Sequence, residues 1–137
     1  AAPFTATIPS GWLAKAGSSK PLHHTFGTEG EVYVSQLGGT LKGSVEIWRS
    51  EMGMPSPSDA DLAALPKVAM LDGEAVLLDM SGDMKGMTKQ LAGARVLVAA
   101  QQSGSSITFA KLVGKAADVE AQKAAFVEFC KSLRRAK

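Results

Sequence analysis

Short runs of alternating apolar and polar residues recur along the chain. Residues 4–8 alternate Phe4, Ala6 and Ile8 with two threonines, which is the period-two pattern of a strand with one buried face. Similar runs are separated by turns that contain glycine, serine or aspartate. The predicted strands are residues 4–8 with a continuation at 12–15, then 22–26, 31–37, 67–71, 74–80, 94–101 and 107–113.

Most of these strands are joined by turns short enough for hairpins. Residues 27–30 separate the strands at 22–26 and 31–37, and Asp72–Gly73 separates two apolar runs. An Asp-Gly pair between apolar runs is among the strongest short hairpin signals. Residues 82–86 are predicted to be a loop. Strands that follow one another through short turns favour an antiparallel sheet.

The period changes in the middle of the chain and at its end. Leu41, Val45, Trp48 and Met52 form one stripe of an amphipathic helix that Gly53 ends.

Two more helices follow from capping signals. Ser58 and Asp61 match an acidic capping box that opens a short helix through Leu65. Asp118 is the predicted N-cap of a closing helix through Leu133. The predicted order is β-β-β-α-α-β-β-β-β-α in one α+β domain over residues 1–137, an antiparallel sheet with helices packed on one face.

Composition narrows the possible partners. The chain has 137 residues, 45% hydrophobic and 20% charged, with a formal net charge of +2, a balance typical of a globular domain. Four of its basic residues lie together at the end of the closing helix, where they complement the helix dipole: Lys131, Arg134, Arg135 and Lys137. The remaining charge is slightly acidic, so nucleic acid is not an expected partner. No apolar run is long enough for a membrane-spanning helix.

Three segments carry a resemblance to a known family. They are Ile8–Trp12, Trp48–Met54 and Phe109–Gly114, the last leading into the closing helix. With these segments the chain resembles a group of uncharacterised bacterial proteins, exported or lipid-anchored, whose fold is similar to the PsbP-like α/β/α sandwich. That wider fold includes the photosystem II extrinsic protein and a nuclear-import factor that binds the Ran GTPase. The resemblance therefore implies binding or assembly work and an extracytoplasmic location, periplasmic or lipid-anchored, and it transfers no functional residue.

Candidate metal ligands are few. His23 and His24 are adjacent on a predicted strand, so they point to opposite faces and cannot jointly bind one metal ion. The six methionines include a group at Met80, Met84 and Met87 and raise the possibility of a copper(I) site. Methionine is also the usual gap-filler of cores. We assign no metal site and no cofactor.

Catalytic signals are equally sparse. The sequence has no G-x-S-x-G motif, no phosphate-binding loop and no dinucleotide fingerprint. Its one cysteine, Cys130, lies on the apolar stripe of the closing helix and is predicted to be a buried, unreactive thiol. No catalytic residue is assigned.

The candidate binding residues are Trp48, Arg49, Glu51 and Asp79. Asp79 interrupts an apolar strand, where a carboxylate must be paired or exposed. Arg49 has Glu46 three residues earlier as a surface ion-pair partner. We predict that Trp48, Arg49 and Asp79 line the rim of a cleft, since tryptophan and arginine are enriched at binding hot spots. Arg49 and Glu51 are expected to be exposed, with little effect on stability.

These observations favour a non-catalytic binding or assembly-accessory domain that contacts a protein partner through the helical insertion at 41–65. Two alternatives remain: a small hydrolase-like enzyme without a recognisable motif, and a Met/His metal-binding protein. The enzyme hypothesis requires two or more titratable groups within hydrogen-bond reach of each other in one cleft. The sequence does not indicate an oligomeric state.

Overall fold

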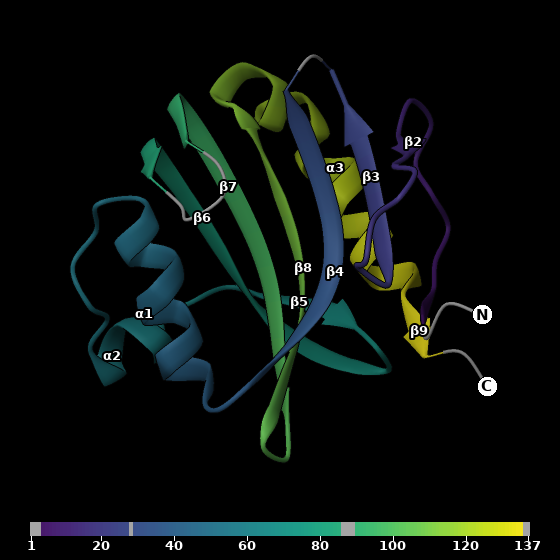
Figure 1. The fold of residues 1–137 in the computed structure, drawn as a ribbon. Coiled ribbons are helices and arrows are strands. Elements are labelled where there is room, and N and C mark those ends of the chain that lie inside the picture. Colours follow the sequence, from purple (N-terminus) through teal and green to yellow (C-terminus); the bar gives the residue numbers. More distant parts are fainter. Residues whose placement is uncertain (1–3, 28, 86–89, 136–137) are drawn as a thin grey trace.

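A seven-stranded antiparallel sheet forms the middle layer of the protein (Figure 1). The structure is a computed structural model, and it describes residues 4–27, 29–85 and 90–135. The strand order is β2-β3-β4-β8-β7-β6-β5, and every neighbouring pair is antiparallel. The strands are β2 (Leu13–Ala14), β3 (Leu22–Phe26), β4 (Gly30–Gly38), β5 (Lys67–Met70), β6 (Gly73–Lys85), β7 (Gln90–Ser103) and β8 (Ser106–Lys115). The antiparallel sheet predicted from the short turns is confirmed.

Helices cover both faces of this sheet (Figure 1). α1 (Leu41–Glu51) and α2 (Asp59–Ala63) lie on one face, and α3 (Ala116–Ser132) lies on the other. The prediction that the helices pack on one face is therefore wrong. The central strands are apolar on both sides: Leu77 belongs to the core under α3, whereas Leu78 belongs to the core under α1. A sheet with two apolar faces needs two helical layers, which gives the α/β/α sandwich that the resemblance implies.

The core under α3 is built from aromatic and aliphatic side chains. Phe126 and Phe129 of α3 are fully buried, and Phe129 lies against Trp12 with ring centroids 5.2 Å apart. The Trp12 indole donates a hydrogen bond of 2.8 Å to Gln122 Oε1 on the same helix. Trp12 thus ties the segment before β2 to α3.

The predicted strand at 4–8 is shorter in the structure. β1 is only Phe4–Thr5, and it pairs with β9 (Arg134–Arg135) in a separate two-stranded sheet. The N- and C-terminal ends of the chain consequently lie side by side (Figure 1). Arg134 also donates hydrogen bonds to the carbonyl oxygens of Lys131 and Leu133. The prediction that basic residues complement the end of the closing helix is therefore confirmed for Arg134.

Two turns differ from their predicted positions. Leu71 and Asp72 both have positive φ, 51° and 59°, and Gly73 already pairs with Met70. The hairpin loop is therefore Leu71–Asp72, one residue earlier than predicted, as in a type I′ turn. The predicted loop at 82–86 is strand up to Lys85, because a register shift after Gly82 lets β6 and β7 continue to pair.

The predicted start of the closing helix is also corrected. Its N-cap is Lys115 and not Asp118, which lies in the first turn of α3. β8 runs directly into the helix, so the chain has no separate capping loop at this point.

Candidate functional site

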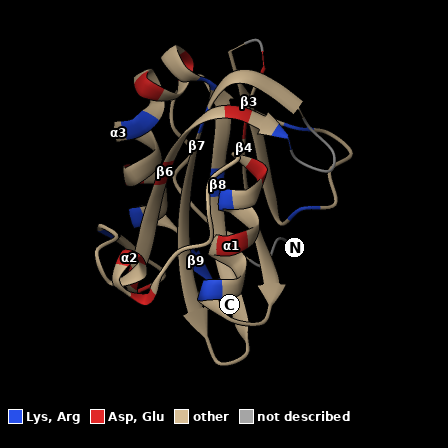
Figure 2. Ribbon diagram, turned by 90° about the vertical axis from the view of Figure 1, so that its left-hand side faces the viewer, with Lys and Arg blue, Asp and Glu red and all other residues tan. Residues whose placement is uncertain are grey.

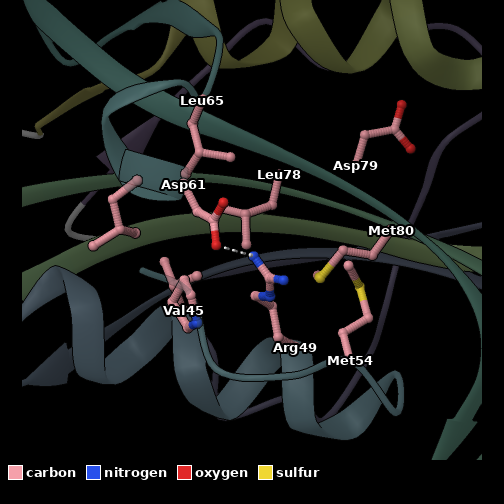
Figure 3. A pocket seen from close by; sticks show the side chains of 10 residues that line it. Val45, Arg49, Met54, Asp61, Leu65, Leu78, Asp79 and Met80 are labelled. Carbon is pink, nitrogen blue, oxygen red and sulfur yellow. Dashed lines mark ion pairs between the residues drawn. The ribbon is translucent and has the colours of Figure 1, made fainter. Parts of the chain in front are cut away.

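A cavity opens between the helical insertion and β6, with a volume of about 350 Å³ including its mouth (Figure 3). Its walls are mostly apolar and come from α1, the segment after it, α2 and β6. The lining residues are Val45, Arg49, Met54, Pro57, Asp61, Leu62, Leu65, Leu78, Asp79 and Met80. We call this space the insertion cavity.

Local sequence signals fix the α1 side of the cavity. Thr40 caps the helix by accepting a hydrogen bond from the Gly43 N–H. At the other end Gly53 adopts a φ of 70°, and the Met54 N–H bonds back to the Arg49 carbonyl at 2.8 Å. This Schellman turn reverses the chain. It brings Met54 over the cavity, where its thioether and that of Met80 point toward one another (Figure 3).

The capping box of α2 fixes the other side. Ser58 Oγ accepts from the Asp61 N–H at 3.0 Å, and Asp61 Oδ2 accepts from the Ser58 N–H at 2.9 Å. The predicted capping box is confirmed. The bond from the Ser58 backbone, with a smaller contribution from Arg49, holds the pKa of Asp61 below its usual range.

Arg49 provides the cavity with its cationic group. Its Nη1 lies 4.0 Å from Asp61 Oδ2, at the outer limit of an ion pair, and the side chain is 17% exposed. Its Nε is buried and has no acceptor among the described residues. A buried donor left without a partner costs about 1 to 3 kcal/mol. The Asp61 pairing also corrects the sequence prediction, which gave Arg49 the surface residue Glu46 as its partner.

Trp48 does not reach the cavity. It is 4% exposed, and its ring packs edge-on against Phe109 of β8 with centroids 5.0 Å apart. The burial predicted by the helical stripe is confirmed, so Trp48 holds α1 on the sheet and cannot form a cleft rim.

Asp79 turns its carboxylate to the opposite face of the sheet. Asp79 borders the cavity, but its carboxylate points away from Arg49 (Figure 3). There it accepts two hydrogen bonds from Arg95, at 2.8 and 2.7 Å, and one from Lys123 of α3 at 2.9 Å. Arg95 also bonds to Glu120. The structure therefore does not bring the predicted trio of Trp48, Arg49 and Asp79 together in one rim.

Glu51 is paired with a buried lysine. Its Oε1 lies 3.1 Å from Lys111 Nζ on β8, and the lysine side chain is 6% exposed against 23% for Glu51. The expectation that Glu51 is an ordinary exposed site is wrong, because removing it would leave the Lys111 charge buried without this partner.

A second polar group lies on the same face of the sheet, over β3 and β4. His23 Nε2 is 2.9 Å from Glu31 Oε1, and His23 Nδ1 is 2.6 Å from Ser18 Oγ. Sequence reasoning missed this group, since Glu31 is eight residues from His23. The signal was present in the predicted hairpin: a turn at 27–30 places residue 31 on the strand beside His23. We call the three residues the Ser18–His23–Glu31 relay.

Candidate metal ligands are dispersed. Three strands lie between β3, with His23 and His24, and β6, with Met80 and Met84. This separation is roughly 19 Å at the usual strand spacing. Met87 lies outside the described residues. Among the described residues no three His, Cys, Asp or Glu side chains are grouped to hold a metal ion.

Two buried titratable groups belong to the core under α3. Burial raises the pKa of the Cys130 thiol to about 12, as expected for an unreactive thiol. Burial, and then the charge of His23, lower the pKa of His24. Neither group faces the insertion cavity.

In the described part of the chain no helix has the length and apolar character needed to cross a membrane.

Charge is evenly mixed on the side of the molecule that carries α1 and α2. Figure 2 shows acidic and basic residues interspersed over this side, with no large area of one sign. The mostly apolar walls of the insertion cavity and its one arginine are the kind of lining that small-molecule sites have.

Comparison with known proteins supports the fold and leaves the function open. No family model and no curated protein matches the sequence. A crystal structure from Bacteroides thetaiotaomicron VPI-5482 matches with a TM-score of 0.56 and 12% identity over 98% of this chain. The chain spans 46% of that protein. The solution structure of cyanobacterial PsbP (CyanoP) from Synechocystis sp. PCC 6803 matches with a TM-score of 0.51 and 11% identity, over 99% of this chain and 94% of CyanoP. The chain is thus an α+β protein with a PsbP-like fold.

Proposed function

We propose that this chain is a binding or accessory domain whose ligand site is the insertion cavity. The observation that carries the proposal is Arg49, a charged side chain at an apolar cavity, and its buried Nε has no acceptor in the part of the chain that the structure describes. A ligand oxygen in the cavity would accept a hydrogen bond from the Arg49 guanidinium. The PsbP-like fold supports accessory work in general terms.

The arrangement of the insertion favours a small ligand over a protein partner. Trp48 and Met52, two of the residues suited to adaptable contacts with a protein, are 4% and 6% exposed. Met54 lines the cavity. The outer face of α1 keeps Ile47, at 56% exposure, as its one large apolar residue among those described. The space inside the cavity is about 80 Å³, well below the usual range of ligand pockets, about 300 to 1,000 Å³, so it admits only a small ligand.

The charges of the site indicate the polar group of the ligand. Arg49 is already accompanied by Asp61, so the pair is close to neutral. A carboxylate ligand would bind Arg49 but would be repelled by Asp61. A neutral oxygen, as in a ketone, amide or alcohol, accepts from Arg49 without that repulsion. We therefore infer a ligand with a short apolar body and a neutral oxygen acceptor.

The test compares 2-hexanone with hexanoate in NMR titrations that follow the backbone amides of Leu62, Leu65 and Leu78. We expect the ketone to bind more tightly to the wild type. Arg49→Met should weaken ketone binding by about tenfold or more, because a hydrogen bond to a charged group contributes about 1.5 to 3 kcal/mol. Lys42→Gln is the matched control, since Lys42 lies on the outside of the same helix and pairs with Asp59.

A second variant tests the role of the ion pair. Asp61→Asn keeps the oxygen that accepts from Ser58 but removes the negative charge, so hexanoate should gain affinity relative to the ketone. If neither ligand shifts these three amides, or if Arg49→Met binds both as the wild type does, the proposal is wrong.

Location is a separate part of the proposal. We propose an extracytoplasmic position, periplasmic or lipid-anchored, on the resemblance to exported bacterial proteins. Fractionation of cells that express the complete gene tests it: recovery in the periplasmic or membrane fraction supports the proposal, and recovery in the cytoplasm alone contradicts it.

A further inference from the structure

Ser18, His23 and Glu31 form a hydrogen-bonded chain of the kind that activates a serine. We propose that Ser18 is a nucleophile, with His23 as its general base and Glu31 as the group that orients the base, and that this site hydrolyses simple carboxylic esters. The site is separate from the insertion cavity, and the inference does not depend on the function proposed for that cavity.

The chemistry of the three groups sets the direction of each hydrogen bond. Glu31 as a carboxylate can only accept, so the neutral imidazole gives it the Nε2 proton over 2.9 Å. The Nδ1 atom then carries the lone pair, and it faces Ser18 Oγ at 2.6 Å. Ser18 therefore donates its proton toward a base. A nucleophile, a base and an orienting acid within hydrogen-bond reach are the signature of covalent catalysis. Here the two ring nitrogens have exchanged roles relative to the usual serine triad.

The sheet holds the base and the acid in place. His23 on β3 pairs with Tyr33 on β4, so Glu31 lies two residues along the neighbouring strand, on the same face. The Tyr33 ring packs against the imidazole with centroids 5.4 Å apart. The His23 side chain is 8% exposed, and Lys15 Nζ lies 3.2 Å from Glu31 Oε1. The imidazole is thus confined by contacts on several sides.

The nucleophile is held by its own loop and is partly open to solvent. Ser18 is half-buried, and its Oγ accepts a hydrogen bond of 3.1 Å from the Lys20 N–H. With the proton directed at His23 and one lone pair directed at Lys20, the hydroxyl has a defined orientation. The enzyme hypothesis requires two titratable groups within hydrogen-bond reach of each other, and His23 and Glu31 meet that distance. They lie on the face of the sheet and not in the insertion cavity.

The reaction would proceed in two balanced steps. Ser18 Oγ attacks the acyl carbon while its proton passes to His23 Nδ1, and the alcohol leaves with that proton, which gives an acyl-serine. Water then attacks the acyl carbon, again losing a proton to Nδ1, and the proton returns to Ser18 Oγ as the acid leaves. No oxidant, reductant or cofactor is needed.

The surroundings of Ser18 limit the substrate to esters. Efficient acyl-transfer enzymes place preorganised donors at the developing oxyanion, each important for the rate. Among the described contacts, Ser18 has a single backbone donor nearby, the Lys20 N–H. We therefore expect slow turnover of esters with good leaving groups, such as p-nitrophenyl acetate, and no hydrolysis of amides.

The experiment measures modification of Ser18 by a fluorophosphonate, a reagent that reacts with activated serines. The wild-type protein should gain one adduct, located at Ser18 by peptide mass spectrometry. Ser18→Ala should abolish the adduct. His23→Gln should slow labelling by at least about 100-fold, the usual contribution of a general base. Glu31→Gln should slow it less. Ser19→Ala, at the adjacent exposed serine, is the matched control and should label at the wild-type rate.

Two results would overturn the inference: no adduct at Ser18 in the wild type, or labelling of His23→Gln at the wild-type rate. Circular dichroism of each variant shows whether it is folded. If His23→Gln does not fold, the wild type and Ser18→Ala still decide, because Ser18 lies in a half-exposed loop whose truncation does not disturb the core. A second assay follows the release of p-nitrophenol from p-nitrophenyl acetate. Continuous release by the wild type, lost in Ser18→Ala, shows that the site turns over and is not only labelled once.

Discussion

On one face of the sheet α3 covers a core whose buried side chains are apolar except for His24 and Thr108, and the charged group of Asp79, Arg95 and Lys123 lies at the border of that core. The other face has a fully charged residue, Lys111, among its buried side chains. Arg49–Asp61 and Lys111–Glu51 both lie on the α1 side. The Ser18–His23–Glu31 relay lies on this side as well. Charges cost free energy to bury. The face under α3 is thus organised for stability, and the opposite face carries the groups that could bind or react.

The largest expected effects test the apolar layers. Phe126→Ala should reduce the free energy of unfolding by about 4 to 5 kcal/mol, because Phe126 is fully buried under α3. Trp48→Ala should cost less, about 3 kcal/mol, since α1 borders a cavity that water can enter. Urea unfolding followed by circular dichroism measures both. Equal losses would contradict the proposed difference between the two faces.

The next largest effect concerns the buried lysine. Glu51→Ala should cost about 1 to 3 kcal/mol, because it leaves Lys111 buried without this partner. Lys111→Met should cost less than 1 kcal/mol, since Glu51 is partly exposed and can be solvated. The same urea measurements compare the two variants. A loss of less than 0.5 kcal/mol for Glu51→Ala, about the size expected at a surface site, would restore the original prediction for Glu51.

The smallest effect is a pH dependence at the border of the α3 face. Hydrogen bonds from Arg95, and then from Lys123, lower the pKa of Asp79 to about 2 in the folded protein. A lowered pKa stabilises the fold above the ordinary pKa of about 4, and this stabilisation is lost as the pH falls toward 2. Asp79 is 29% exposed, so we expect about 1 kcal/mol. The difference in unfolding free energy between wild type and Asp79→Asn should be present at pH 7 and disappear near pH 2. A difference that stays constant with pH would show that the carboxylate is not responsible.

Local patterns predicted much of the fold. The Leu41 stripe, the Ser58 capping box and the strand at 22–26 depend on neighbours in the sequence, and the structure has each of them. The second helical layer was implied by the family resemblance but not by the local patterns, because strand periodicity was read as one-sided, although Leu77 and Leu78 are buried on opposite faces. Whether one or both faces of a strand are buried depends on its place in the whole sheet and not on its own sequence.

The candidate site was less predictable for the same reason. Arg49 was identified from its position beside a tryptophan, but its partner Asp61 comes from another helix. Asp79 was placed on the wrong side because a strand residue can face either way until its neighbours are known. The relay joins a loop and two strands, and only the hairpin register brings Glu31 to His23.

The pairing of β1 with β9 has a topological consequence. Because Phe4 lies opposite Arg135, a few residues of linker could join the two ends into a ring without disturbing the sheet. The chain could then be reopened at the exposed turn between β7 and β8, around Gly104. Such a circular permutant would keep α3 and its core intact. It would also allow the domain to be inserted into a loop of a host protein, where the neighbouring ends enter and leave at one point.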